Sequence, residues 1–496
     1  MQYSHWQSAD GYSSAVRPVL PGVDGAVCAA HPLAVAAGQD MLLRGGSAVD
    51  AAIAAQAVLC VVMPDACGIG GDLFALVRDS TGTSAISGAG AAPAKGTVCA
   101  DDGANSITVP GLAGAWASMH ARWGTLPFAV ILSRAIALAE GGIEVSAAMV
   151  QTVQAQSSRL RANGAASWTL LGLTAGERFV QKELAALLRL FAEHGPLCFY
   201  EGEVAAHIAR AVAAHGGALD EADLAAHMTD VGPALAVALG DMTMMVQPPP
   251  TQGVLLGMAL RNFSGLSPHS VVQADHLAVE LTEAAFAYRD RAAEGAALLD
   301  VELAANPNSA SRRGGPRAYL HTAGVSVADR HGLVVSSLVS VFDDFGSCLL
   351  VPELGITLNN RAGGFTQGAN AWAPGRRPVH TLAPALLCSP QGTLALATPG
   401  ADGQVQTLLQ LVMRMLCHGE DIAAAIAAPR WRSQGGSLLI EEGHPSHAGL
   451  AALGHDVVPM APGATCFGAV VCTGIGANGA PFAVADWRRT TWAGVV

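Results

Sequence analysis

The amino-acid sequence predicts a layered α/β protein, and three observations support this fold class. Apolar residues make up 51% of the 496 residues and charged residues only 13%, where about a quarter is usual, so a large packed core is expected. Helical patterns occupy most of residues 30–300, and strand patterns follow after residue 320. The 57 glycines have no three-residue period, which excludes a collagen-like rod. Helices before and after a run of strands are typical of a fold in which helices cover a sheet.

Two helices joined by a glycine pair open the expected order of elements. Pro32 suits the first turn of a helix, and the glycines at 45–46 are typical of its end. Ser47 and Asp50 have the spacing of a capping box for a second helix at 48–62. We therefore expect two antiparallel helices at the start of the chain.

Most of the remaining chain before residue 300 is expected to be helical. A strand at 73–78 follows the glycine-rich run 67–72. Periodic apolar residues predict helices at 112–123, 128–140, 147–158, 182–193, 203–215 and 274–294. Residues 305–321 are polar, contain Pro, Gly and three Arg, and form the one linker-like segment.

The second half of the chain begins with a predicted hairpin. Strands at 322–328 and 333–341 are joined by a turn that ends in glycine. Further strands are expected at 348–351, 356–358, 383–387 and 394–397, followed by a helix at 404–417.

Charge and terminal sequence exclude several classes of function. The 27 basic and 39 acidic residues give a net charge of −12 without a basic stripe, which argues against nucleic-acid binding. The longest apolar run, residues 51–63, is shorter than the roughly 18 residues of a membrane-spanning helix. Residues 1–14 lack the basic and apolar regions of a secretory signal, so we expect a cytoplasmic protein that does not bind membranes.

The ten cysteines are scattered and form no C-x-x-C pair. Buried reduced thiols are the expected state, with a disulfide or a metal site as the alternative. No H-E-x-x-H or G-x-S-x-G pattern occurs, and we expect neither a metal nor an organic cofactor. The run Gly68-Ile-Gly-Gly71 follows a helix and lacks the G-x-G-x-x-G spacing, so it does not predict a dinucleotide site.

Thr322 is the first candidate for chemistry, because the polar segment 305–321 runs directly into the strand that begins with this threonine. Cleavage of the His321–Thr322 bond would free an α-amine, whose pKa of about 8 suits a general base for the threonine hydroxyl. The alternative is a threonine that simply begins a strand.

Eight motifs occur in an order that is typical of one known family. They lie at 29–52, 68–71, 109–124, 248–250, 320–329, 355–360, 398–400 and 428–430. With these motifs, the chain from about residue 25 to 490 resembles the gamma-glutamyltranspeptidase family of N-terminal-nucleophile hydrolases. The resemblance implies a four-layer αββα sandwich that assembles from a self-cleaving precursor.

The resemblance also implies the products of that cleavage. A cut before Thr322 would give a large chain, residues 1–321, and a small chain, residues 322–496, intertwined in one unit. The expected assembly is a heterodimer of these chains, or a pair of such heterodimers, acting on a small-molecule amide.

Catalytic residues follow from the same resemblance. The nucleophile of the family falls on Thr322, and a hydroxyl that hydrogen-bonds it falls on Ser340. The two backbone N–H groups of the oxyanion hole fall on Gly400 and Ala401, where the second position is usually glycine. Alanine preserves the donor only if its backbone conformation suits an L-residue.

The substrate positions depart from the pattern of members that act on glutathione. Ala89 stands where those members hold the glutamyl carboxylate with an arginine. Arg361 and Gly364 stand where they hold the α-amine with acidic or amide residues. The other predicted substrate-binding residues are Phe342, Asn359, His380 and Thr381.

These departures predict that glutamyl recognition is lost while amide cleavage is kept. An ammonium group would meet Arg361 instead of an acid, and the α-carboxylate would lose its arginine at position 89. A small amide that bears a carboxylate and lacks the α-amine suits the arginine fork, as in the branch of the family that hydrolyses oxamate. Alternatives are a gamma-glutamyl transferase or hydrolase, an acylase of the cephalosporin acylase type, and a non-catalytic relative. For Arg361 the alternative is a surface or inter-subunit ion pair.

Overall fold

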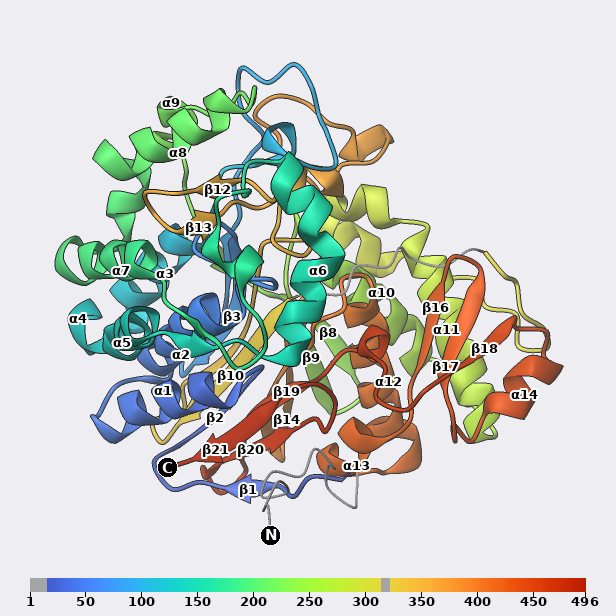
Figure 1. Cartoon of the computed structure of the whole chain (residues 1–496). Coiled ribbons are helices and arrows are strands. Elements are labelled where there is room, and N and C mark those ends of the chain that lie inside the picture. Colours follow the sequence, from blue (N-terminus) through green and yellow to red (C-terminus); the bar gives the residue numbers. More distant parts are fainter. Residues whose placement is uncertain (1–15, 314–321) are drawn as a thin grey trace, which may run out of the picture.

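Two face-to-face β-sheets with helices on both outer sides make up the protein (Figure 1). The structure is a computed structural model, and it describes residues 16–313 and 322–496. The layer order is helix, sheet, sheet, helix, so the predicted αββα sandwich is confirmed. The predicted cleavage-site residue His321 lies outside the described residues.

The first sheet has seven antiparallel strands, drawn from both sides of residue 322. Its order is β21 (Trp492–Val495), β2 (Gly25–Ala29), β10 (Ala323–Asp329), β11 (Val334–Ser340), β3 (Asp72–Asp79), β4 (Gly82–Gly88) and β7 (Asp230–Pro233). The hairpin β10–β11 is therefore inserted between strands β2 and β3.

The second sheet also has seven strands and faces the first. Its order is β1 (Leu20–Pro21), β20 (Pro481–Ala485), β19 (Val471–Gly476), β15 (Gly392–Ala397), β14 (Ala385–Ser389), β9 (Met242–Val246) and β8 (Leu235–Leu239).

The outer layers are two groups of helices on opposite sides of the sandwich (Figure 1). The first sheet is covered by α1 (Pro32–Leu43), α2 (Ala48–Val62), α3 (Leu112–Trp123), α5 (Ser133–Gly141) and α7 (Lys182–His194). The second is covered by α10 (Gly253–Ser264), α11 (Val271–Phe286), α12 (Gly403–His418) and α13 (Ile422–Ala427). Each group forms its own apolar core against one sheet.

Side chains alternate between the two faces along the central strands. Val325 of β10 packs under the helices, whereas Ala328 of the same strand packs between the sheets. Leu338 of β11 and Phe74 of β3 also pack between the sheets. Because the side-chain period of a strand is two, these three residues fix the inward face of each strand.

Shorter elements complete the chain. The helices are α4 (Phe128–Ile131), α6 (Ala147–Ala162), α8 (Gly202–Ala214), α9 (Glu221–Ala225) and α14 (His447–Ala452). The strands are β5 (Ile143–Glu144), β6 (Arg178–Phe179), β12 (Leu350–Val351), β13 (Ile356–Thr357), β16 (Trp431–Gln434), β17 (Ser437–Glu441) and β18 (Val457–Met460). The 3₁₀ helices are η1 (Ala104–Ser106), η2 (Thr169–Gly172), η3 (Pro196–Tyr200), η4 (Arg289–Asp300), η5 (Arg361–Gly364), η6 (Gly368–Asn370) and η7 (Thr465–Phe467).

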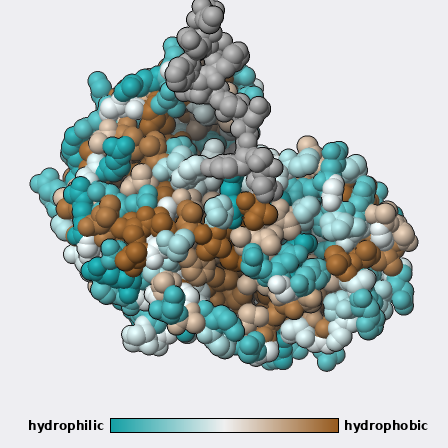
Figure 2. All heavy atoms as spheres, turned by 90° about the horizontal axis from the view of Figure 1, so that it is seen from below, coloured by the Kyte–Doolittle hydropathy of each residue, from teal (hydrophilic) through white to brown (hydrophobic). Residues whose placement is uncertain are grey.

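The surface seen from below carries hydrophobic side chains among polar ones (Figure 2). In residues 16–313 and 322–496, no helix has both the length and the apolar character needed to cross a bilayer.

The local signals at the start of the chain are confirmed, whereas two helix predictions are wrong. Ser47 and Asp50 form the predicted capping box of α2. The helix expected at 128–140 is divided into α4 and α5 at Leu132. The helix expected at 274–294 ends at Phe286, and the chain continues as η4, in which Gly295 has a positive φ of 61°.

Candidate active site

Thr322 directly precedes β10 and is 4% exposed. Its Oγ1 lies 3.4 Å from the Oγ of Ser340, the last residue of β11, as a hydrogen-bond donor. The Ser340 Oγ also accepts a hydrogen bond of 3.0 Å from the backbone N–H of Phe342. The hairpin therefore brings the two predicted hydroxyl residues together.

Asp72 extends this pair into a row across the sheet. It is the first residue of β3, and its Cα lies opposite that of Ser340 in the strand register. Thr322, Ser340 and Asp72 are each an even number of residues from an inward-facing residue of their own strand, so all three side chains face the second sheet. Neighbouring strands lie about 4.8 Å apart, which places Asp72 about 10 Å from Thr322.

A buried charged cluster surrounds Asp72. Its Oδ2 lies 3.3 Å from the Nε of Arg361 and 3.1 Å from the Nε2 of His380, and all three side chains are at most 1% exposed. The backbone N–H of Gly111 donates to Oδ1 at 3.4 Å. Burial raises the pKa of Asp72 to about 6, although the Arg361 charge acts in the opposite direction.

His380 is held as a neutral ring with a defined tautomer. The backbone N–H of Leu382 donates to Nδ1 at 3.2 Å, so Nε2 carries the proton that Asp72 accepts. Burial, reinforced by the nearby Arg361, holds the pKa of His380 well below its usual value. Phe74 packs against the ring with a centroid distance of 4.4 Å.

Arg361 presents part of its guanidinium without a partner. Burial lowers its pKa to about 10, so the side chain stays charged at neutral pH. Nε is bonded to Asp72, and Nη1 lies 3.5 Å from the Oγ1 of Thr381. Nη2 is buried and has no hydrogen-bond partner within the described part of the chain. A surface ion pair is excluded for Arg361, because the side chain is 0% exposed. The inter-subunit alternative stands, because Asp72 lies in the predicted large chain and Arg361 in the predicted small chain.

Phe342 forms an apolar wall beside this guanidinium. The Cζ of Arg361 lies 4.2 Å from the centre of the Phe342 ring, which is a cation–π distance. Phe342 has a φ of 87°, a left-handed conformation that is rare for a bulky residue. Such strained residues cluster at functional sites.

The Asn359 side chain supports the loop that carries Arg361. Its Oδ1 accepts hydrogen bonds from the Thr108 N–H at 3.1 Å and from the Arg361 N–H at 3.1 Å. Its Nδ2 donates to the Thr108 carbonyl at 3.1 Å and to the Gly70 carbonyl at 3.4 Å. The substrate contact expected for Asn359 stays a prediction; the contacts in the structure are with its own scaffold.

Gly400 and Ala401 lie in the loop between β15 and α12. Ala395 of β15 packs in the same cluster as Val334, and Ala397 packs in the same cluster as Leu338. The strands β15 and β11 therefore run in the same direction on the two facing sheets. The loop after Ala397 therefore follows the end of β11, where Ser340 lies.

The backbone of this loop has an unusual conformation. The φ angles are 123° at Gly400 and 48° at Ala401, so the alanine is left-handed, which costs about 1–2 kcal/mol. Both residues are buried, and neither N–H donates a hydrogen bond to any other described residue. Buried N–H groups without acceptors are rare, so these two are available for a ligand oxygen.

Gln252 anchors the same loop, and its role was not foreseen from the sequence. Its Nε2 donates to the carbonyls of Ala401 at 2.8 Å and Thr381 at 2.7 Å. Gln252 thereby links the loop of Ala401 to the segment of His380 and Thr381. Asp72 was also missed as a site residue; its place after the glycine-rich run was the one signal available.

Ala89 and Gly364 lie near the cluster and offer no charge to a ligand. Ala89 packs with Phe74 and Leu382 between the sheets. Gly364 ends η5, and a Cβ added there would come within 3.8 Å of the Arg361 Cδ. Gly364 therefore lies beside Arg361, and Ala89 lies beside two residues that contact His380.

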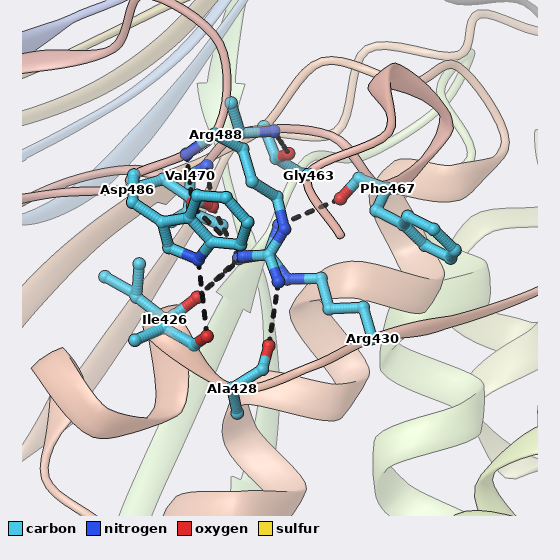
Figure 3. Close-up of polar contacts among 12 residues, drawn as sticks. Ile426, Ala428, Arg430, Gly463, Phe467, Val470, Asp486 and Arg488 are labelled. Carbon is cyan, nitrogen blue, oxygen red and sulfur yellow. Dashed lines mark hydrogen bonds and ion pairs between the residues drawn. The ribbon is translucent and has the colours of Figure 1, made fainter. Parts of the chain in front are cut away.

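A second buried charge cluster binds the C-terminal end of α13 (Figure 3). Arg430 Nη2 donates to the Ile426 carbonyl at 2.9 Å and pairs with Asp486 at 2.6 Å. Arg488 donates to the same carbonyl at 3.1 Å and pairs with Asp486 and Glu441. Two arginines thus satisfy carbonyls at the C-terminal end of the helix.

This cluster also supports the strand that reaches the loop. Arg430 leads into β16, which carries Arg432. A Cβ built on Gly403 would lie 2.7 Å from the Arg432 Nη1, so a side chain at the first residue of α12 would displace the buried Arg432 guanidinium.

Comparison with known proteins agrees with this architecture. The sequence model of a family described as Gamma-glutamyltranspeptidase matches residues 34–496. The oxamate amidohydrolase proenzyme of Klebsiella pneumoniae is 33% identical over 485 residues, covering 88% of this chain and 92% of the relative. The Acylase ACY 1 proenzyme of a Pseudomonas strain is 32% identical with 88% of each chain covered. The crystal structure of a cephalosporin acylase from Bacillus halodurans matches with a TM-score of 0.88, 27% identity and 99% coverage of both chains.

Proposed function

The chain belongs to the gamma-glutamyltranspeptidase family, and on that premise we propose that it is a self-processing threonine amidohydrolase for a small amide that carries a carboxylate and lacks an α-amine. The observation that carries the substrate half of this proposal is the buried Arg361, whose Nη2 has no partner among the described residues.

Processing generates the nucleophile. The chain is cut between His321 and Thr322, giving residues 1–321 and 322–496, and the Thr322 α-amine becomes free. This amine takes the proton of the Thr322 hydroxyl as the oxygen attacks the amide carbon. Ser340 supports the hydroxyl through the contact of 3.4 Å.

The tetrahedral intermediate carries its negative charge on the former amide oxygen. The N–H groups of Gly400 and Ala401 donate hydrogen bonds to this oxyanion, since both are buried and oriented by the left-handed backbone. The C–N bond breaks, and ammonia or an amine leaves with the proton from the Thr322 amine. Water then hydrolyses the ester, so the net reaction is an amide plus water giving a carboxylate and an amine.

Arg361 selects the substrate by its charge. Its Nη1 and Nη2 edge suits a carboxylate, which accepts two parallel N–H bonds from a guanidinium. A glutamyl α-amine would meet this cation, because Gly364 supplies no acid and Asp72 is already paired with Arg361. The glutamyl α-carboxylate would also lack the arginine that Ala89 replaces. The row from Asp72 to Thr322 spans only about 10 Å, which favours a short substrate.

An acylase is the second candidate, and Phe342 favours it. The ring lines the guanidinium with an apolar surface that suits an acyl chain between the carboxylate and the amide. The two candidates differ in the length of chain that separates the carboxylate from the amide carbon.

A chain-length series tests the proposal. Processed enzyme is assayed for ammonia release from oxamate, malonamate, succinamate and glutaramate, with malonamide as a neutral control. A γ-glutamyl anilide, the family substrate, is assayed by the release of its aromatic amine. The proposal expects turnover of at least one short acid amide and loss of that preference in Arg361→Met. Preferential turnover of the longer acids would favour the acylase. Strong turnover of the anilide, or of malonamide above every acid, would contradict the substrate class.

A further inference from the structure

Asp72 and Arg361 already neutralise each other before any substrate arrives. Both side chains are 0% exposed and lie 3.3 Å apart. His380 adds no charge, because Nδ1 accepts from Leu382 and Nε2 donates to Asp72. A carboxylate that binds Arg361 would therefore leave one uncompensated negative charge in a buried site.

Two arginines near the cluster have acidic partners elsewhere, and Asp343 accepts a hydrogen bond of 2.8 Å from the Asn360 amide. Arg289 of η4 lies 3.5 Å from Asp402, and Arg377 pairs with Asp230. The groups that act electrostatically on Asp72, Arg361 or His380 are Arg289, Arg377, Asp343 and, through its hydroxyl, Tyr200.

We propose that Asp72 takes up one proton when a substrate carboxylate binds Arg361, so that the buried site stays neutral. This inference rests on the carboxylate specificity of the proposed function. The proton comes from solvent and binds an Asp72 oxygen, while the Nη2 of Arg361, which has no partner among the described residues, donates to the substrate carboxylate. His380 is the poorer acceptor, since protonation of Nδ1 would break its bond from the Leu382 N–H.

Two carboxylates that share one site cannot both stay ionised without a large cost, and one pKa rises strongly. Asp72 is prepared for this role, because burial has already raised its pKa to about 6. A modest further rise carries it above neutral pH. Asp72 is thus a positioning residue that couples substrate affinity to pH, and it does not touch the reacting carbon.

The direction of the pH effect follows from these states. Below about pH 6 Asp72 is already protonated in the free enzyme, and carboxylate binding is independent of pH. Above that pH binding must take up a proton, so the affinity falls by up to tenfold per pH unit.

Calorimetry with propionate tests the inference, because this carboxylate has no amide to cleave. Processed enzyme is titrated between pH 6 and 8.5 in two buffers of different ionisation enthalpy, which gives the number of protons taken up. The expected uptake approaches one proton per propionate near pH 7.5, and the dissociation constant rises at least tenfold from pH 6 to 8.

Asp72→Asn should bind propionate without proton uptake and with an affinity that is independent of pH. At pH 8 it should bind more tightly than wild type, whereas a merely structural role would weaken binding at every pH. Asp343→Asn is the matched control, since Asp343 also acts on Arg361 but does not share its hydrogen bond, and it should keep the uptake.

Binding of propionate to wild type without proton uptake at pH 7.5 would overturn the inference, even if Asp72→Asn does not fold. Uptake that persists in Asp72→Asn would overturn it too, because another group such as the Thr322 amine would then hold the proton. Absence of propionate binding would remove the carboxylate site and the inference with it, whereas cleavage of acid amides with a pH-independent KM would refute the inference alone.

Discussion

Ser340 is the residue on which the nucleophile depends most directly in the structure. Its Oγ accepts from the Thr322 hydroxyl and from the Phe342 N–H. We expect Ser340→Ala to lower kcat about ten- to hundredfold, because two donors lose their acceptor beside the reacting oxygen. Ser340→Thr keeps the hydroxyl and should retain most of the activity. Equal losses in both variants, measured by steady-state kinetics, would contradict this role.

Arg361 is expected to act through its fork rather than through its charge alone. Arg361→Lys keeps a cation but cannot form two parallel bonds, so KM for an acid amide should rise about tenfold or more. Arg361→Met should show the larger increase, because the carboxylate then has no partner. Unchanged KM values in both variants would place the carboxylate elsewhere.

Single residues differ in how well the sequence alone identifies them as part of the site. Thr322 can be identified because a polar segment runs into a predicted strand that begins with it. Asp72 cannot, because its proximity to Arg361 and His380 arises from strand register and from loops about 300 residues away in the chain. Asn359 could be placed near the site, but only the structure shows that both atoms of its amide bind the scaffold.

The loop of Gly400 and Ala401 is an element held from outside by Gln252. Gln252→Ala removes two hydrogen bonds, to Ala401 and to Thr381. We expect kcat to fall about tenfold while the fold is kept, since the oxyanion donors lose their alignment. Gln410→Ala is a matched control, because Gln410 is also buried but bonds to Trp431, away from the loop. Similar losses of kcat in both variants would indicate a general packing defect.

The second buried charge cluster, which contains Arg430 and Asp486, stabilises α13 and takes no part in the reaction (Figure 3). Arg430→Met leaves Asp486 buried with one cation fewer, which should lower the free energy of unfolding by about 3–5 kcal/mol. Arg330→Met removes an exposed pair with Asp24 and should cost less than about 1 kcal/mol. Urea unfolding followed by circular dichroism measures both. Equal losses of unfolding free energy in the two variants would show that burial of the Arg430–Asp486 pair adds nothing to the stability of the protein.

Elements with strong terminal signals were predictable, and elements defined by the core were not. The proline and glycine signals of α1 and the capping box of α2 act locally, and both helices were found. Most strands of the second sheet were missed, including β19 and β20. Their short runs mix apolar residues with glycine and proline, and only pairing within the sheet makes them strands. The helix predicted at 274–294 was too long, because α11 ends at Phe286 and the chain continues as the 3₁₀ helix η4.

At the scale of the whole molecule, the proposed cut divides a chain whose halves share both sheets. The hairpin β10–β11 lies between β2 and β3, and β21 pairs with the other edge of β2. Processed chains should therefore stay together through size-exclusion chromatography and separate only in denaturant. Chains that part under native conditions would contradict this intertwined assembly.

The four-layer architecture followed from the family resemblance, whereas composition and patterning supported only a layered α/β fold. What neither could supply is the contact between the sheets. Phe74, Leu338 and Leu382 pack there in one apolar cluster. Each lies two residues along the chain from a site residue, so this cluster fixes how deeply Asp72, Ser340 and His380 lie between the sheets. Packing across the sandwich thus decides which of the predicted residues meet.

Thr322 becomes an N-terminal nucleophile in the proposed mechanism, and mass spectrometry of the purified protein shows whether this processing takes place. We expect two polypeptides, residues 1–321 and 322–496, with Thr322 as the new N-terminus, and a single uncut chain for Thr322→Ala. A wild-type protein that stays in one piece, or that is cut at another bond, would contradict this mechanism.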